Sequence, residues 1–212
     1  MRFQYIAVEG VIGVGKTAVV ERLAERLDAT TVLEEWSQNP FLKPFYEGAP
    51  GAAFQVELFF LLSRYRQQQE LTQRSLFNQF TISDYLFEKS KVFAYVNLED
   101  SELLIYEKLY SLLAESVPRP DLVVYLQAPT EVLMKRIRAR GRPEETRLSE
   151  EYLAEVNRAY NYYFFHYAQT PLLVVNTADV DLVKNDEDLD DLIRQIRSMG
   201  KGTQYYVPRG SK

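Results

Sequence analysis

Short apolar runs alternate along the chain with longer segments in which every third or fourth residue is apolar. The apolar runs predict five strands, at Phe3–Val8, Thr31–Leu33, Phe80–Ser83, Leu122–Leu126 and Leu172–Val175. Because the first and fourth runs are apolar almost throughout, they are typical of parallel strands covered on both faces. The pattern therefore favours an α/β fold built on a buried parallel sheet.

The segments with helical periodicity predict the elements between these strands. They are Thr17–Leu27, Ala53–Thr72, Leu86–Asn97, Ser101–Ser116, Thr130–Arg140, Ser149–Ala168 and Asp188–Met199. Strands that alternate with helices predict a five-stranded parallel sheet flanked by helices on both faces, with the ligand at the carboxyl ends of the strands. Since the chain shows no repeat and no linker, we expect one domain over residues 1–199 and a loose polar tail over residues 200–212. The tail residues Val207-Pro208-Arg209-Gly210-Ser211 resemble an engineered protease site, and whether they are native is left open.

Composition narrows the class of protein. A chain of 212 residues fits one domain, and 46% hydrophobic with 13% aromatic residues indicates a globular protein. The net charge of −5 argues against a nucleic-acid polymer as partner, because such binding favours a basic face. The lack of cysteine and the single His166 exclude disulfides, thiolate catalysis and cysteine or histidine-cluster metal sites. With no leader sequence and no apolar run of membrane-spanning length, we expect a cytoplasmic enzyme without a membrane partner.

The first predicted strand is followed by a phosphate-binding motif with the spacing G-x-x-x-x-G-K-T. It reads Gly10-Val11-Ile12-Gly13-Val14-Gly15-Lys16-Thr17 and opens the first predicted helix. The glycines let several backbone N–H groups point at one spot, and the helix start adds its free N–H groups and positive dipole end. Lys16 is placed to reach the outer phosphates, and Thr17 to hold Mg²⁺. An ordinary glycine-rich turn needs no Lys-Thr pair, so the motif predicts a site for ATP or another nucleoside triphosphate.

Two carboxylates follow the next strands and bear on the phosphate acceptor. Glu34 closes the second strand, where it can accept the proton of a hydroxyl that attacks the γ-phosphorus. A pair of acidic residues, Glu34 and Glu35, that only solvates the strand end is about equally well supported. Asp84 ends the third strand, where it can hold Mg²⁺ through water beside Thr17 and also cap the next helix. No N-K-x-D motif is present, which argues against a GTPase.

Five arginines crowd the end of the helix Thr130–Arg140 and the loop after it. They are Arg136, Arg138, Arg140, Arg142 and Arg147. Cations at a helix carboxyl end complement its dipole, but five exceed that need. Gly141 and Pro143 mark a mobile loop, so we expect an arginine-rich lid that folds guanidinium groups over the transferring phosphoryl group.

Together these residues resemble the deoxynucleoside kinase family from about Phe3 to Asn176. Beyond the phosphate-binding motif, the matched pieces are Glu34 with Asn39-Pro40-Phe41, Phe45-Tyr46, Phe54-Gln55-Val56-Glu57 through Ser63-Arg64, Asp84, and Arg136-x-x-x-Arg140-Gly141-Arg142-Pro143-Glu144-Glu145. The similarity is greatest to the bacterial deoxyguanosine kinase branch, which shares the F-Q-x-E run and the D-Y pair after the third strand. The resemblance implies a P-loop kinase fold, ATP and Mg²⁺ as cofactors, and a homodimer.

The resemblance also implies roles for the matching residues. Glu34 is implied as the catalytic base for the 5′-hydroxyl, with Lys16, Arg140 and Arg142 acting on the phosphoryl group. Tyr46 and Glu145 are implied to hold the sugar 3′-hydroxyl, and Arg136 to join the lid at the nucleotide. Together with Asp84 beside the metal, these contacts to the substrate make up the site that the resemblance implies. Many relatives place an arginine after the strand-three carboxylate, whereas this chain has Tyr85, so Lys89 or a lid arginine is left to replace that clamp on the 5′-oxygen.

Glu57 bears on the choice of base. Many relatives have glutamine there, which offers one donor and one acceptor and suits adenine or cytosine. An ionised glutamate only accepts, which suits the adjacent N1–H and 2-amino donors of guanine. A helix places Glu57 and Arg64 on one face, roughly 10 Å apart along its axis. The sequence leaves three arrangements open: Glu57 reads the base, Glu57 only pairs with Arg64, or Arg64 orients Glu57 while it reads the base.

The leading hypothesis is an ATP- and Mg²⁺-dependent kinase for the 5′-hydroxyl of a purine deoxynucleoside, with deoxyguanosine preferred, acting in nucleotide salvage. A deoxyadenosine/deoxycytidine or broad-specificity kinase is the alternative. A thymidylate-type monophosphate kinase is disfavoured because no extra cation near Glu34 awaits an acceptor phosphate. A nucleotide-binding switch without turnover is disfavoured by the arginine lid and the placed base.

Overall fold

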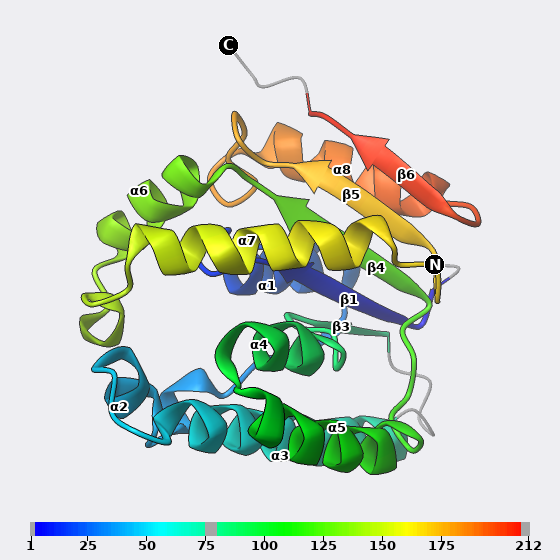
Figure 1. Ribbon diagram of the computed structural model, residues 1–212. Helices are drawn as coiled ribbons and strands as arrows, with labels where there is room; N and C mark the ends of the chain where they lie inside the picture. The colour runs from blue at the N-terminus through cyan, green and yellow to red at the C-terminus, as the bar shows by residue number, and fades with distance from the viewer. Residues whose placement is uncertain (1–2, 75–79, 209–212) are drawn as a thin grey trace.

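One parallel sheet organises the molecule. The computed structural model describes residues 3–74 and 80–208 (Figure 1). Its strands are β1 (Tyr5–Gly10), β2 (Thr30–Val32), β3 (Thr81–Ser83), β4 (Leu122–Gln127), β5 (Leu172–Asn176) and β6 (Thr203–Tyr206). They lie in the order β2-β3-β1-β4-β5-β6, and every neighbouring pair is parallel. The predicted α/β fold is confirmed, and all carboxyl ends of the strands meet at one edge.

Helices cover both faces of this sheet. They are α1 (Lys16–Leu27), η1 (Trp36–Gln38), α2 (Leu42–Tyr46), α3 (Ala52–Arg74), α4 (Lys89–Asn97), α5 (Asp100–Ala114), α6 (Thr130–Arg140), η3 (Pro143–Glu145), α7 (Glu150–Phe165) and α8 (Asp186–Ser198). In Figure 1, α1 and α8 lie behind the sheet and α7 crosses its front. Helix α4 packs against α7, and α3 and α5 pack against α4. No helix within the described residues is long and apolar enough to cross a membrane.

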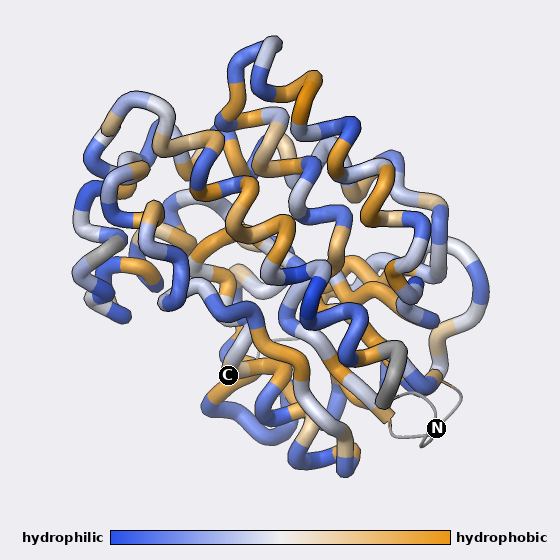
Figure 2. Tube along the Cα trace, turned by 90° about the horizontal axis from the view of Figure 1, so that it is seen from below, coloured by the Kyte–Doolittle hydropathy of each residue, from blue (hydrophilic) through white to orange (hydrophobic). Residues whose placement is uncertain are grey.

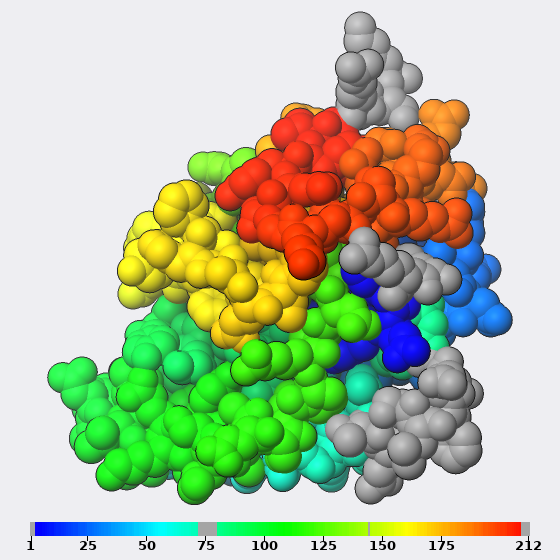
Figure 3. Space-filling model, turned by 90° about the vertical axis from the view of Figure 1, so that its right-hand side faces the viewer, coloured from blue at the N-terminus to red at the C-terminus, as the bar shows by residue number. Residues whose placement is uncertain are grey.

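The prediction of five strands is wrong, because the sheet has six. The sixth strand, β6, comes from the segment for which the sequence predicts a loose polar tail. Its residues are mostly exposed and lack an apolar pattern, and backbone pairing with β5 holds them at the sheet edge. Figure 3 shows this red segment and α8 on one side of the molecule, next to the yellow end of α7. Residues 209–212 of the predicted tail, with most of the protease-site-like sequence, lie outside the described residues.

Two hydrophobic clusters stabilise these layers. The larger joins the sheet to α1, α6, α7 and α8, and in it Tyr125 of β4 stacks on Phe164 of α7 at 4.2 Å between ring centroids. The smaller joins α3, α4 and α5 through Leu61, Ala94 and Tyr106, all of which are fully buried. Figure 2 shows hydrophobic positions interspersed with hydrophilic ones along the chain. The second cluster fixes α3 and α4 side by side, and these helices carry polar groups of the site described next.

Candidate active site

The phosphate-binding loop joins β1 to α1 at the carboxyl edge of the sheet. Gly13 and Gly15 have φ values of 88° and 99°, a region that side chains disfavour. A Cβ on Gly13 would lie 2.6 Å from Ile137 Cγ1 and 2.9 Å from the Leu133 carbonyl oxygen. The loop therefore packs so closely against α6 that only glycine fits at this position.

Lys16 is folded over this loop. Its Nζ donates to the carbonyl oxygen of Gly10 at 2.5 Å and to that of Val11 at 3.3 Å. Burial lowers the pKa of Lys16 to about 8. The ammonium group is thus held against the carbonyl oxygens of the phosphate-binding loop and lines the cavity.

Asp84 connects the three segments that meet beside the loop. Its Oδ2 accepts from Thr17 Oγ1 at 2.5 Å, and its Oδ1 accepts from the backbone N–H of Glu34 at 2.7 Å. A hydroxyl and a carboxylate are hard oxygen ligands of the kind that Mg²⁺ takes together with substrate phosphates and water. No group of three or more histidine, cysteine or acidic residues suited to a metal occurs in the described chain. Thr17 and Asp84 therefore fit Mg²⁺ only with such additional oxygens.

Glu9 is a site residue that sequence reasoning missed. It is fully buried at the end of β1, and its carboxylate accepts from Gly10 N at 2.8 Å and from Leu86 N at 2.9 Å. The side chain thereby ties the phosphate-binding loop to the segment that follows Asp84. The sequence did contain a signal for Glu9, because it is an acidic residue at the end of an otherwise apolar strand.

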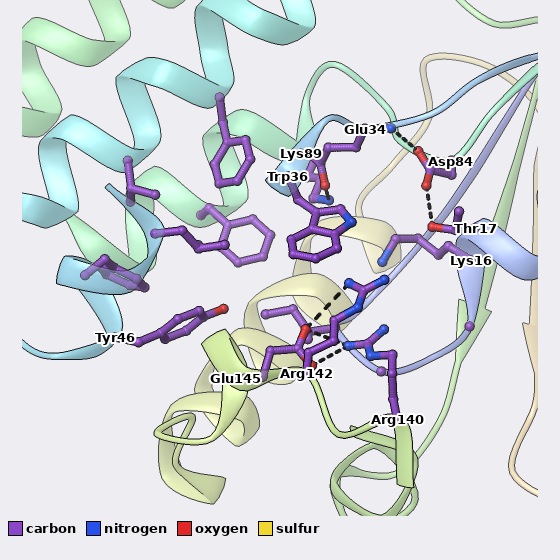
Figure 4. Close-up of a pocket in the computed structure, with 18 of the residues that line it drawn as sticks. Lys16, Thr17, Glu34, Trp36, Tyr46, Asp84, Lys89, Arg140, Arg142 and Glu145 are labelled. Carbon is purple, nitrogen blue, oxygen red and sulfur yellow. Dashed lines mark hydrogen bonds and ion pairs between the residues drawn. The ribbon is translucent and has the colours of Figure 1, made fainter. Parts of the chain in front are cut away.

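Glu34 lies between two cations, so the expectation that no extra cation lies near it is wrong. Its Oε1 accepts from Arg64 Nε at 2.8 Å and Nη2 at 2.5 Å, and its Oε2 accepts from Lys89 Nζ at 2.7 Å (Figure 4). Burial opposes ionisation, but the charges of Arg64 and Lys89 outweigh it and hold the pKa of Glu34 well below its usual range. Glu34 is therefore an ionised, oriented carboxylate, and it lines a cavity at this edge of the sheet. Its neighbour Glu35 pairs with Arg66 outside that cavity.

The ion pair of Arg64 with Glu34 excludes one of the arrangements that the sequence left open, in which Glu57 pairs with Arg64. Arg64 also donates to Ser90 Oγ at 2.8 Å and lies over the ring of Phe60, and it forms no ion pair with Glu57. Glu57 is buried, and its Oε1 accepts from Asn97 Nδ2 at 2.7 Å while Oε2 has no hydrogen-bond partner. Burial raises the pKa of Glu57 to about 7. The one-helix pairing of Glu57 with Arg64 is thus wrong, because a carboxylate on another element captures the guanidinium.

The arginines of α6 and of the loop after it divide into two groups. Arg140 Nη2 donates to both carboxylate oxygens of Glu145, at 2.6 and 2.7 Å, and the Arg142 guanidinium lies 3.9 Å from the ring centroid of Trp36. Both arginines line the same cavity as Glu34. Arg136 does not: it donates to the Thr177 carbonyl oxygen at 2.6 Å and to the Val14 carbonyl oxygen at 3.3 Å. Arg136 therefore supports the phosphate-binding loop from outside the pocket that Arg140 and Arg142 line.

The remaining predicted residues meet in the same cavity of about 450 Å³, a size that suits a small molecule. The Tyr46 ring projects into it, on the side where Glu145 lies (Figure 4). Burial, followed by the charge of Glu145, raises the pKa of Tyr46, so its hydroxyl stays protonated. Aromatic side chains that the sequence did not single out complete the wall: Trp36, Phe60, Phe93 and Tyr152. They come from four different elements, so no local pattern could have identified them.

The cavity has two chemically distinct ends. The phosphate-binding loop, Asp84, Arg140 and Arg142 provide cations and hard oxygens. In Figure 4, Lys16, Thr17 and Asp84 lie on the opposite side from Tyr46, and the charge of Glu57 acts on the Tyr46 hydroxyl. Glu34 and Lys89 lie between them. An acceptor that spans this space would present hydrogen-bond donors to Glu57 and a reactive group to Glu34.

Comparisons with known proteins show the family and the fold of the chain. The sequence matches the profile of the deoxynucleoside kinase family over residues 6–200. It is 32% identical over 200 residues to the deoxyguanosine kinase of Bacillus subtilis, covering 92% of this chain and 97% of that protein. It is 28% identical over 201 residues to the deoxyadenosine/deoxycytidine kinase of the same organism, with 92% of each covered. The fold is similar to that of deoxyadenosine kinase from M. mycoides with bound dATP, at a TM-score of 0.78 and 22% identity over 92% of this chain and 100% of that one.

Proposed function

The chain belongs to the deoxynucleoside kinase family of phosphotransferases, and we propose on that premise that it transfers the γ-phosphoryl group of ATP to the 5′-hydroxyl of deoxyguanosine. The observation that carries the choice of base is the Glu57 carboxylate, which is buried in the lining of the cavity with one oxygen unpartnered. Guanine offers two adjacent donors that match such a group. A buried acceptor that meets another acceptor would cost about 1–3 kcal/mol, enough to discriminate between bases by tenfold or more.

Glu34 is the proposed catalytic base. As the 5′-oxygen forms its bond to the γ-phosphorus and the bond to the β,γ-bridging oxygen breaks, the hydroxyl proton passes to the Glu34 carboxylate. The two ion pairs orient this carboxylate and keep it ionised before substrate arrives. Its low basicity suits a loose transition state, in which the hydroxyl loses its proton late.

Lys89 is the proposed replacement for the arginine that many relatives place after the strand-three carboxylate. Tyr85, at that position, is fully buried and does not line the cavity. Lys89 Nζ lies on Glu34 Oε2, within reach of an oxygen that approaches the same carboxylate. It therefore clamps the attacking 5′-oxygen and balances the charge of the pair.

The other contacts follow from the two ends of the cavity. Tyr46 and Glu145 hold the sugar 3′-hydroxyl, and Arg140 and Arg142 turn from Glu145 and Trp36 to the transferring phosphoryl group. Lys16 and the loop N–H groups bind the phosphates, and Thr17 with Asp84 holds Mg²⁺. The metal, when bound, neutralises charge on the phosphate oxygens.

The proposal is tested by incubating the protein with Mg-ATP and each of the four deoxynucleosides, guanosine and dTMP. We expect deoxyguanosine to give the highest kcat/KM and dTMP to give no product. A higher kcat/KM for deoxyadenosine or deoxycytidine would support the alternative that the second relative in Bacillus subtilis suggests. Reaction with dTMP alone would instead assign a monophosphate kinase.

We also propose that the protein is a cytoplasmic homodimer. The support is the family resemblance and the exposed apolar residues of α5, among them Leu104, Ile105 and Leu112. Burial of this face in a second copy would remove apolar surface from water. Sedimentation equilibrium should give about twice the mass of one chain, and a Leu112→Glu variant should shift it toward the monomer.

A further inference from the structure

The two oxygens of Glu57 have unequal surroundings. Oε1 accepts a hydrogen bond from Asn97 at the carboxyl end of α4, whereas Oε2 is buried and has no hydrogen-bond partner among the described residues. A polar atom in that position is costly unless a ligand or a proton satisfies it. Oε2 of Glu57 can therefore be satisfied either by a hydrogen-bond donor of a ligand or by a proton of its own.

No direct counter-ion stabilises the charge of Glu57. On its own helix, Arg64 is paired with Glu34, and on α4, Lys89 is paired with the same carboxylate. The other titratable groups that interact with Glu57 are the negative Glu34 itself and the hydroxyls of Tyr46, Tyr106 and Tyr152, from α2, α5 and α7. Arg64 and Lys89 favour the ionised form through space, and the Asn97 hydrogen bond adds to this. Burial outweighs them, so the pKa of Glu57 rises to about 7, where both forms are populated.

The two forms present different hydrogen-bonding patterns. The carboxylate accepts at both oxygens and matches the N1–H and 2-amino donors of guanine. In the carboxylic acid, Oε1 remains the acceptor because Asn97 donates to it, and Oε2 carries the proton. That form offers one acceptor beside one donor, which matches the 6-amino group and the N1 lone pair of adenine. Neither base gains or loses a proton near neutral pH, so the titrating group in this window is on the protein.

We propose that Glu57 is a protonation-dependent base reader, which selects guanine as the carboxylate and adenine as the carboxylic acid. The inference rests on the proposed function, because it concerns the base of the same deoxynucleoside. Binding of deoxyguanosine then releases the Glu57 proton, and binding of deoxyadenosine takes one up. The nucleoside that this kinase favours changes with the pH around it.

A competition assay measures this directly. Deoxyguanosine and deoxyadenosine are mixed with Mg-ATP at a series of pH values from about 6 to about 8, and the two products are quantified together. Titrations of Glu34, Lys16 or the phosphates affect both products alike and cancel in the ratio. For one group with a pKa near 7, we expect the kcat/KM ratio of deoxyguanosine to deoxyadenosine to rise at least tenfold, toward a limit of about 100-fold.

A Glu57→Gln variant fixes the acid-like pattern, because its amide has one donor and one acceptor at every pH. Its ratio should favour deoxyadenosine and stay constant across the series. The matched control is Glu155→Gln on α7, which removes an exposed carboxylate outside the cavity and should retain the wild-type slope. An Asn97→Leu variant loses the hydrogen bond to Oε1, and its transition should move to higher pH.

Calorimetry provides a readout that does not depend on turnover. Deoxyguanosine binding at about pH 7, repeated in buffers of different ionisation enthalpy, should release about half a proton per site, and deoxyadenosine should take up a similar amount. Both proton exchanges should vanish in Glu57→Gln. If wild type phosphorylates both nucleosides in a ratio that does not vary with pH, the inference is overturned and the kinase assignment stands. If no deoxynucleoside is phosphorylated, the proposed function fails and the inference with it.

Discussion

Glu34 and Glu57 are two buried carboxylates of one cavity that differ in their charged neighbours. Glu34 has a cation on each oxygen, so it stays ionised far into the acid range. Glu57 has one neutral donor and no ion pair, so its pKa is raised to about 7. At the scale of single residues, the placement of Arg64 and Lys89 therefore decides which carboxylate stays ionised and which can titrate near neutral pH.

Replacing Glu34 tests its role as the base. In Glu34→Gln the amide no longer accepts the 5′-hydroxyl proton, and Arg64 and Lys89 lose their common partner. We expect kcat to fall about 100-fold or more, with a smaller change in the KM for the nucleoside. The matched control is Glu35→Gln, since Glu35 is adjacent but pairs with Arg66 outside the cavity, and it should retain kcat within about twofold. Equal losses in both variants would contradict the assignment.

Glu57 should make the stability of the free protein depend on pH. Its pKa rises from 4.5 to about 7 on folding, so between these values the native state binds a proton that the unfolded state does not. The free energy of unfolding therefore falls as pH increases across this window. A Glu57→Gln variant escapes the loss and should exceed wild type by about 1–3 kcal/mol at about pH 8 relative to their difference at about pH 5. Urea unfolding at both pH values measures this, and a difference that does not change with pH would contradict it.

At the scale of elements, the loop after α6 contacts the segment after β2. Arg142 lies over Trp36 of η1, and Arg140 pairs with Glu145 of η3, so the fold supplies a protein partner for each of the two arginines. A guanidinium over an indole ring contributes about 0.5–2 kcal/mol, which the phosphates of a bound nucleotide can exceed. The contact therefore positions Arg142 near its target without competing strongly for it.

Trp36 is the only tryptophan of the chain, so its fluorescence reports on this contact. Binding of a non-hydrolysable ATP analogue with Mg²⁺ should draw Arg142 off the ring and change the emission. In Arg142→Gln that change should be largely lost and kcat should fall about 10- to 100-fold. Arg138→Gln, which removes an exposed arginine of α6 outside the cavity, is the control and should resemble wild type. An unchanged spectrum of wild type at saturating analogue would rule out the movement.

At the scale of the whole molecule, the sheet brings the site together at its carboxyl edge and is extended on the far side by β6. The pairing of β6 with β5 covers an edge that otherwise presents unpaired backbone groups. Tyr206 also packs on the large cluster and donates its hydroxyl to Asp191 of α8. The C-terminal segment thus contributes to the stability of the domain while lying away from the cavity.

Truncation after Lys201 should therefore separate stability from catalysis. Loss of β6 and of the Tyr206 contacts should lower the free energy of unfolding by about 2 kcal/mol and the melting temperature by roughly 5 °C. The kcat at a temperature well below the transition should be unchanged, because no cavity residue is removed. Calorimetry and initial rates measure the two effects, and Tyr206→Phe isolates the share of the hydroxyl. An unchanged melting temperature would show that β6 adds no stability.

The sequence by itself determined the features that depend on local physics. The phosphate-binding loop requires glycines with positive φ and a Lys-Thr pair at set spacing, and the strands and helices follow from apolar periodicity, so both could be predicted. Glu34 and Asp84 were placed at the site from their positions at the ends of strands. Tyr46, Glu57 and Glu145 were placed there from the family resemblance, and all five line the cavity.

Tertiary structure alone decided the features that depend on competition between distant segments. Arg64 lies on the same helix as Glu57, yet it pairs with Glu34, thirty positions away, and that choice leaves Glu57 without a counter-ion. Arg136 belongs to the arginine cluster in sequence but donates to Thr177 and Val14 outside the cavity. Strand β6 has no apolar pattern and forms because β5 presents an open edge. In each case the energies of ion pairs and hydrogen bonds depend on which partners the fold brings within about 3 Å, and sequence spacing does not contain that information.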